Sequence, residues 1–276
     1  MPSDTRYTGQ MDPLASQITA LHNQGRLRVW SMVITVFGDL VQHRGGQIST
    51  ARLGRILGRV GVEQGALRTA LSRLGRDGWV HSERVGRTSH YRLSADGLAR
   101  FAPATIRIYA PPRSKPVTSW AITLRLGPTG RQEVTLGPAD EVADGADCVV
   151  TGDLQQVSQA YRASLLSDEH RNALAALAAD IEALSIKDLS VPLDAAAARV
   201  LLIHRWRRIV LRFPEIPPEL MPSNAPLSDP RAAVAGAYGR LTVATEVWLD
   251  NDFAGLPAMA TVTDPLPQRF QALEKG

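Results

Sequence analysis

The chain has 276 residues and a net charge of +4, with 44% hydrophobic and 21% charged residues. This composition is ordinary for a soluble globular protein, and the length favours two or three modules over one compact core. No apolar run approaches the length of a membrane span and the N-terminus lacks the layout of a secretory signal, so a cytoplasmic location is expected. The single cysteine, Cys148, excludes an intramolecular disulfide, and its apolar setting predicts a small buried residue.

Positive charge is concentrated in one part of the chain. Residues 26–100 hold thirteen arginines, no lysine and five acidic residues, a net charge of +8 that leaves −4 for the remainder. An arginine-rich segment attached to a mildly acidic body is typical of a nucleic-acid-binding protein with a separate regulatory portion. A general bias toward arginine explains the choice of arginine over lysine, but not the excess over acids.

The N-terminal elements are predicted from apolar spacing and capping residues. Residues 1–25 show no sustained periodicity and are interpreted as an arm with one short helix. Apolar residues three and four apart predict a helix over 27–41, which a glycine pair ends. A short second helix is expected after an N-cap at Ser49 or Thr50.

A third helix is predicted over 63–77. Projected at about 100° per residue, it places its apolar residues on one side: Leu67, Ala70, Leu71 and Leu74. The other side and its margin carry the predicted DNA-contacting residues of this helix: Arg68, Thr69, Ser72, Arg73 and Arg76. The alternative is that these side chains form an ordinary solvated face.

Two alternating runs, residues 79–83 and 89–93, predict a β-hairpin with Gly86 at its turn. The wing contacts are expected at or beside its tip: Arg84, Arg87 and Thr88. Three helices followed by a β-ribbon predict a winged helix-turn-helix, in which the third helix enters the major groove and the ribbon reaches an adjacent backbone or minor groove. The same module can instead serve only in contacts with other proteins. In a closing helix after the hairpin, Leu98, Phe101 and Ile106 are expected to pack inward.

The proline-rich stretch at residues 111–116 is interpreted as a stiff linker and a domain boundary. Residues 117–165 then predict a small α+β unit, with strands over 117–126, 132–136 and 147–151 and a helix over 153–161. This unit carries acids that could serve as metal ligands of a nuclease: Asp140, Glu141, Asp144, Asp147 and Asp153. Because several of them lie in glycine-rich turns and show no metal-ligand spacing, solvated loops are the favoured interpretation.

Residues 166–276 predict a helical domain. Ser167 is expected to cap its first helix, and Asp229 followed by Pro230 to begin its last. The long helix over 193–213 has an inward stripe of large side chains: Leu202, Trp206, Ile209 and Phe213. His204 is expected to pack on its own helix.

One face of this long helix carries three cations, Arg205, Arg208 and Arg212, which repel one another unless an anion lies nearby. The favoured interpretation is neutralisation by acids of neighbouring helices: Asp168, Glu169, Asp180, Glu182 or Asp188. The alternative is a docking surface for a phosphate-bearing effector, which suits the bidentate geometry of arginine.

Four segments together resemble the PaaX family of transcriptional regulators, known for repressors of phenylacetic acid catabolism: "FGDLVQHRGG", "LRTALSRLGRDGWVHSERVGRTSHYRLS", "RIYAPP" and "HRWRRIVLRFPEIPPELMP". The resemblance implies an α+β architecture with a winged helix-turn-helix over 26–110, a small central ferredoxin-like domain similar to Cas2, and a C-terminal helical domain. It also implies a homodimer that binds a pseudo-palindromic operator and is released by an aryl-CoA thioester such as phenylacetyl-CoA.

Catalysis has little support in the sequence. The six histidines are scattered, and neither a Ser/His/Asp order nor a phosphate-binding glycine loop is found. We therefore expect a regulator that is not an enzyme and needs no cofactor, with the metal-dependent nuclease as the rival.

Overall fold

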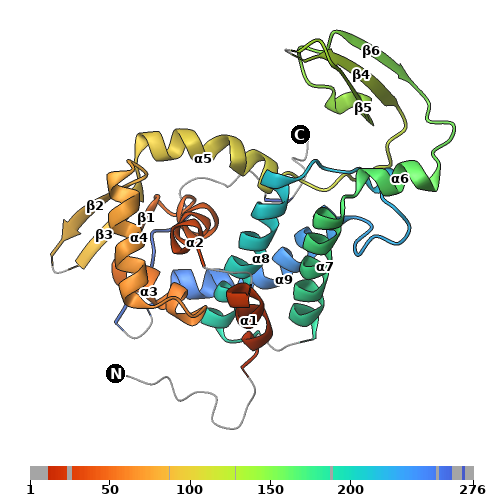
Figure 1. Ribbon diagram of the computed structural model, residues 1–276. Helices are drawn as coiled ribbons and strands as arrows, with labels where there is room; N and C mark the ends of the chain where they lie inside the picture. The colour runs from red at the N-terminus through yellow and green to blue at the C-terminus, as the bar shows by residue number, and fades with distance from the viewer. Residues whose placement is uncertain are drawn as a thin grey trace.

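The structure is a computed structural model that describes residues 12–23, 27–86, 88–127, 129–186, 189–252, 255–262 and 269–270. Within these ranges the fold is α+β, with a helical body and two small antiparallel sheets of three strands each. One sheet lies beside the N-terminal helices and the other at the opposite end of the body (Figure 1). None of the helices in the described ranges is long and apolar enough to cross a membrane.

The N-terminal part comprises helices, a π-helical turn and a three-stranded sheet. In chain order these are α1 (Ala15–Asn23), α2 (Val29–Val36), η1 (Phe37–Val41), β1 (Gln47–Ser49), α3 (Thr50–Arg59), α4 (Gln64–Arg76), β2 (Val80–Val85), β3 (Thr88–Leu93) and α5 (Ala95–Ile108). Strand β1 pairs with β3, and β3 pairs with β2, all antiparallel. The predicted helices and hairpin are therefore present, together with a first strand that the sequence pattern did not reveal.

Capping residues fix where the helices of the N-terminal part begin. Ser49 accepts a hydrogen bond from the Arg52 amide at 3.1 Å, which confirms it as the cap of α3. Ser94 caps α5 by accepting from the Gly97 amide at 2.9 Å, and its hydroxyl also donates to the Gly78 carbonyl at 2.5 Å. Gly97 is required there, because a Cβ would lie 2.3 Å from the Trp79 carbonyl oxygen. The start of α5 is thus pressed against the base of the hairpin.

The central segment forms a second sheet followed by helices. Its elements are β4 (Trp120–Leu126), β5 (Gln132–Pro138), η2 (Ala139–Glu141), β6 (Cys148–Gly152), α6 (Gln159–Leu165) and α7 (Asp168–Ser185). The strand order is β5-β4-β6, and all pairings are antiparallel. Within the described residues no helix joins β4 to β5, so a complete βαββαβ unit is not seen there. The helix predicted over 153–161 begins only at Gln159.

The C-terminal part adds α8 (Pro192–Arg212), η3 (Pro218–Leu220) and α9 (Pro230–Asp250). The predicted caps are confirmed: Ser167 accepts from the His170 amide at 3.3 Å, and Asp229 accepts from the Ala232 amide at 2.9 Å. Pro230 occupies the first turn of α9, where its missing N–H costs no hydrogen bond.

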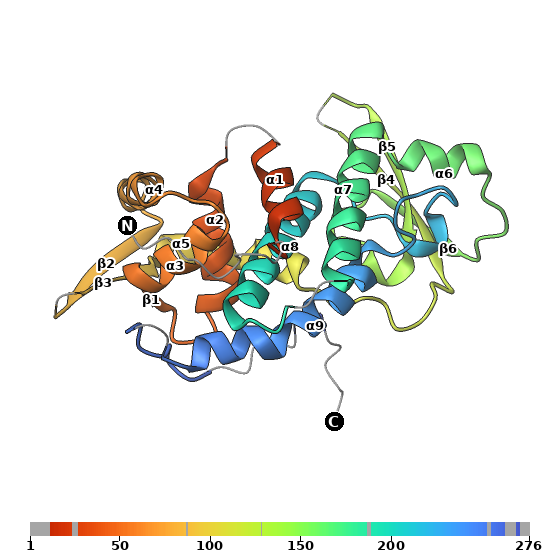
Figure 2. The ribbon, with the colours of Figure 1, turned by 90° about the horizontal axis from the view of Figure 1, so that it is seen from below.

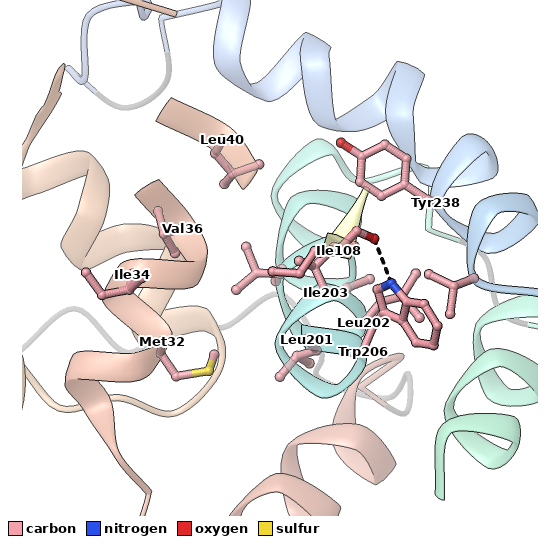
Figure 3. Packing of buried hydrophobic residues seen from close by; sticks show 14 of the residues in the cluster. Met32, Ile34, Val36, Leu40, Ile108, Leu201, Leu202, Ile203, Trp206 and Tyr238 are labelled. Carbon is pink, nitrogen blue, oxygen red and sulfur yellow. Dashed lines mark hydrogen bonds between the residues drawn. The ribbon is translucent and has the colours of Figure 1, made fainter. Parts of the chain in front are cut away.

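Helix α8 lies in the middle of the body, and its apolar side chains belong to the same buried cluster as those of α2 (Figure 3). Leu202, Ile203 and Trp206 are at most 3% exposed, as are Met32 and Ile34 of α2. The Trp206 indole N–H donates to the Ile108 carbonyl at 2.8 Å. The predicted segments 26–110 and 166–276 therefore share one hydrophobic core.

Cys148, Leu98 and Ile106 were predicted to be buried, and all three predictions are wrong. Cys148 is exposed, because β6 is an edge strand whose residues are all exposed. Leu98 and Ile106 are 43% and 76% exposed, because α5 turns Phe101 and Ile108 inward instead. His204 is buried as expected, but its imidazole Nδ1 lies 3.1 Å from Thr35 Oγ1, so it connects α8 to α2.

Candidate nucleic-acid interface

Helix α4 separates an apolar face from a polar one. Its buried residues are Leu67, Ala70, Leu71 and Leu74, which pack into the N-terminal core. All five residues predicted as DNA contacts of this helix are exposed: Arg68, Thr69, Ser72, Arg73 and Arg76. The helix therefore presents three guanidinium groups and two hydroxyl groups on one accessible surface.

The exposed side chains of α4 make only local contacts in the described residues. Thr69 Oγ1 donates to the Gly65 carbonyl one turn earlier at 3.0 Å. Arg73 Nε lies 3.4 Å from Asp77 Oδ2, and both side chains are more than half exposed. Such a solvated pair between residues four apart is worth a few tenths of a kcal/mol, so Arg73 can exchange it for another anion at little cost.

The β2–β3 hairpin projects from the body beside α4 (Figures 1 and 2). Arg84 and Thr88 are both exposed near its tip, and Arg84 Nε donates to the Gly86 carbonyl at 3.3 Å. Gly86 has a φ of +61°, the left-handed conformation that a tight turn requires. Arg87 was also predicted at this tip, and it lies outside the described residues.

Three acids of the central segment, Asp140, Glu141 and Asp147, make side-chain contacts within the protein. Arg113 binds Asp140 at 2.7 Å and Glu141 at 2.6 Å. Asp147 Oδ2 accepts from the Leu126 amide at 2.7 Å, which closes the loop before β6. In the part of the chain that the structure describes, no group of three or more His, Cys, Asp or Glu side chains could hold a metal ion.

The three arginines of α8 lie along one side of that helix. Arg205 forms a largely buried ion pair with Asp180, and Arg212 forms an exposed one with Glu169, both from α7. These two pairs confirm the predicted neutralisation by a neighbouring helix. Arg208 is exposed, and partial desolvation together with Arg205 and Arg212 lowers its pKa. A cavity of about 10 Å³ beside Arg205 has room for no more than about one water molecule.

Sequence reasoning missed a cavity of about 710 Å³ between the central sheet and the helical body. Its walls combine β4 and β5 with the end of α5, α7, α8 and the start of α9. These elements are far apart in the chain, and each wall residue has the local pattern of an ordinary core or surface residue. No local sequence signal could have brought them together.

Two family models match the chain: a PaaX-like protein over residues 28–97 and a PaaX-like protein C-terminal domain over residues 153–251. The chain is 26% identical to the transcriptional repressor PaaX of Escherichia coli (strain K12) over 254 residues, which cover 78% of this chain and 80% of the relative. Among solved structures it is similar to the uncharacterized protein Rv0674 from Mycobacterium tuberculosis, with a TM-score of 0.46, 20% identity, and coverage of 78% of this chain and 95% of that one. By the two family matches and the Escherichia coli relative, the chain belongs to the PaaX family.

Proposed function

We propose that this protein is a DNA-binding transcriptional repressor whose N-terminal part is a winged helix-turn-helix. The observation that carries the proposal is the exposed side of α4, where Arg68, Arg73 and Arg76 project away from the buried leucines of the same helix. Arginine can donate two hydrogen bonds to a guanine edge in the major groove, which a helix of this width can enter. The Escherichia coli relative is named a transcriptional repressor, which supports repression over activation.

The element order supports the winged form of the module. Helices α2, α3 and α4 are followed directly by the β2–β3 hairpin, and β1 completes the sheet on the other side of β3. With α4 as the recognition helix, the hairpin is the wing, and Arg84, Arg87 and Thr88 are its proposed contacts to backbone or minor groove. The central segment is proposed as a reduced form of the ferredoxin-like domain that the family resemblance implies.

Binding is proposed to involve a homodimer on double-stranded operator DNA, since two-fold symmetric proteins match pseudo-palindromic sites. Release is proposed to follow binding of a small anionic effector, an aryl-CoA thioester such as phenylacetyl-CoA. Of the three arginines proposed for it, Arg208 and Arg212 are exposed and can exchange partners, whereas Arg205 is held by Asp180 in a largely buried pair.

The rival functions receive less support. A nuclease in the central segment would need its carboxylates free for metal ions, yet Asp140 and Glu141 bind Arg113. A module used only for contacts with other proteins predicts no salt-dependent DNA binding.

The test begins by selecting bound fragments from random DNA and measuring their affinity at several salt concentrations. Arg73→Ala is expected to weaken binding to the selected site by about 1–3 kcal/mol if Arg73 contacts a base, or to reduce the salt slope by about one if it contacts a phosphate. Arg131→Ala is the matched control, because Arg131 is an exposed arginine beside the central sheet, away from α4. Equal affinity and equal salt slope for both variants and the wild type would remove Arg73 from the proposed interface.

Effector binding is tested by calorimetry with phenylacetyl-CoA. The double variant Arg208→Gln with Arg212→Gln keeps the Arg205–Asp180 pair and is expected to bind this thioester at least tenfold more weakly than the wild type. Unchanged binding would contradict the role proposed for these two side chains.

A further inference from the structure

The cavity beside the central sheet has the walls of a binding site. Trp206, which is 3% exposed, lines the cavity together with apolar side chains of α7, α8 and the following proline-rich segment. The His170 ring is stacked parallel to Phe213, with ring centroids 4.4 Å apart and planes 2° apart. Burial lowers the pKa of His170, so this imidazole is neutral at neutral pH. A volume of about 710 Å³ is in the range that drug-sized ligands and cofactors occupy.

The guanidinium groups in the cavity wall are already hydrogen-bonded within the protein. Arg231 binds Glu215 through two hydrogen bonds of 2.6 Å, and Arg113 binds Asp140 and Glu141. Arg107 and Arg125 donate to backbone carbonyls, at 2.7 Å to Val210 and 2.9 Å to Asp144. An anionic ligand inside the cavity would have to compete for these guanidinium groups with Glu215, Asp140 and Glu141, whose carboxylates are more than half exposed.

We propose that this cavity binds the flat, uncharged, largely apolar part of a small organic molecule, between the aromatic wall and the β4–β5 sheet. The inference rests on the proposed function and names where the body of its effector is held. Arg212 lies with its guanidinium 5.4 Å from the centre of the Phe213 ring, so an anionic group attached to such a ligand would find a cation next to a wall residue.

Helix α5 connects this cavity to the hairpin. Its C-terminal end is held by hydrogen bonds to wall residues: Arg231 donates to the carbonyls of Arg107 and Ala110, both at 3.0 Å, and Trp206 donates to that of Ile108. Its N-terminal end is held to the base of the hairpin by the Ser94 hydroxyl. The helix has 14 residues and is about 21 Å long, and Pro103 within it lacks an N–H, so one hydrogen bond of its ladder is missing. Because both ends are held by hydrogen bonds, a ligand that shifts the cavity end acts on the hairpin end.

The sheet offers a matched pair of variants. Gly137 pairs with Ala121 and lines the cavity, whereas Gly152 pairs with Trp120, so the two glycines belong to opposite faces of the sheet. A Cβ at either position would meet nothing within 4 Å, and neither glycine has a positive φ. Gly137→Phe therefore places an aromatic ring inside the cavity, and Gly152→Phe places the same ring outside it.

The probe is N-phenyl-1-naphthylamine, an uncharged aromatic amine whose fluorescence rises in apolar sites. The wild type and Gly152→Phe are expected to bind it with equal affinity, and Gly137→Phe at least tenfold more weakly. Ile106→Glu, which places a carboxylate on a 76% exposed residue of the cavity wall, is expected to weaken binding several-fold and guards against a folding defect in the phenylalanine variant. Equal probe binding by the wild type, Gly137→Phe and Ile106→Glu would overturn the proposal.

Measuring DNA binding on the same proteins separates the two proposals. If all four proteins bind DNA in a salt-dependent way and also bind the probe with equal affinity, the cavity proposal is contradicted and the proposed function is not. Loss of probe binding in Gly137→Phe together with no DNA binding by the wild type contradicts the proposed function and leaves the cavity as a ligand site.

Discussion

Arg199 of α8 donates its Nε to Asp39 Oδ2 of η1 at 2.9 Å, with the two side chains 1% and 0% exposed. The other carboxylate oxygen of Asp39 accepts from the hydroxyls of Tyr109 and Tyr238, at 3.0 and 3.1 Å, and from Arg269 at 2.7 Å. One buried carboxylate thus joins η1 to α8, to α9, to Tyr109 at the end of α5 and to Arg269. Burial, followed by the charge of Asp39, raises the pKa of both tyrosines, which keeps their hydroxyls protonated as donors.

Asp39→Asn is expected to reduce the free energy of unfolding by about 3–5 kcal/mol, because it removes the anion from a buried site that retains two arginines. Urea denaturation followed by circular dichroism measures the change. Glu83→Gln is the control, since the Glu83–Arg92 pair is more than half exposed on both sides and its loss should cost less than about 1 kcal/mol. A loss below 1 kcal/mol for Asp39→Asn would show that the network contributes little to stability.

Stability should fall as the pH falls below 7, in part through His204. Burial, with smaller contributions from three neighbouring arginines, lowers its pKa to about 3, whereas an unfolded histidine titrates near about 6.5. Between these values the unfolded state binds the extra proton, so this contribution to stability is present above the unfolded pKa and is lost as the pH falls. From pH 7.5 to 5.5 the loss from His204 is about 1.4 kcal/mol.

The measurement compares unfolding free energies of the wild type and His204→Gln at both pH values. The glutamine side chain can still reach Thr35 but does not titrate, so the variant should lose about 1.4 kcal/mol less over this interval than the wild type. His43 and His170 also have lowered pKa values and add a background of the same sign to both proteins. Identical pH dependence in the two proteins would rule out the contribution of His204.

Arg52 joins α3 to the end of α9 through backbone carbonyls. Its guanidinium donates to the carbonyls of Trp248 at 2.6 Å, Asn251 at 3.0 Å, Leu256 at 3.3 Å and Pro257 at 2.8 Å. Arg52→Lys keeps the charge but supplies one nitrogen where the guanidinium supplied two, so we expect a loss of about 2–4 kcal/mol. Hydrogen exchange at the end of α9 should accelerate. Arg68→Lys, on an exposed residue, should change neither quantity.

Stability and DNA binding should respond to different faces of α4. Leu71→Ala removes a side chain that is 3% exposed and should lower the unfolding free energy by about 2–5 kcal/mol. Arg73→Ala should change the unfolding free energy by no more than about 0.5 kcal/mol, the range of a surface substitution, while it weakens DNA binding. A destabilisation of Arg73→Ala similar to that of Leu71→Ala would mean that Arg73 has a packing role instead.

Local patterns in the sequence predicted much of this arrangement. The spacing of Leu67, Leu71 and Leu74 predicted both the extent of α4 and its exposed side, and serines or an aspartate marked the starts of three helices, α3, α7 and α9. These signals work because capping and amphipathic periodicity involve residues within about one or two turns of each other.

What the sequence did not predict depends on partners that are distant in the chain. Asp39 is separated from Arg199 by 160 residues, and nothing beside it indicates that a carboxylate in an apolar helix has a buried partner. The cavity has the same origin, because its glycine, its tryptophan and its stacked rings belong to separate elements. The exposure of Ile106 was missed because α5 has its packing partners on one side only.

The division of α4 into two faces has a consequence for how such proteins can diverge. The side chains that hold the helix in place are not the ones it displays, so the displayed set can be exchanged with little penalty in folding. One scaffold can then acquire new binding preferences by a few surface substitutions, while the interior that sets the angle of the helix is retained.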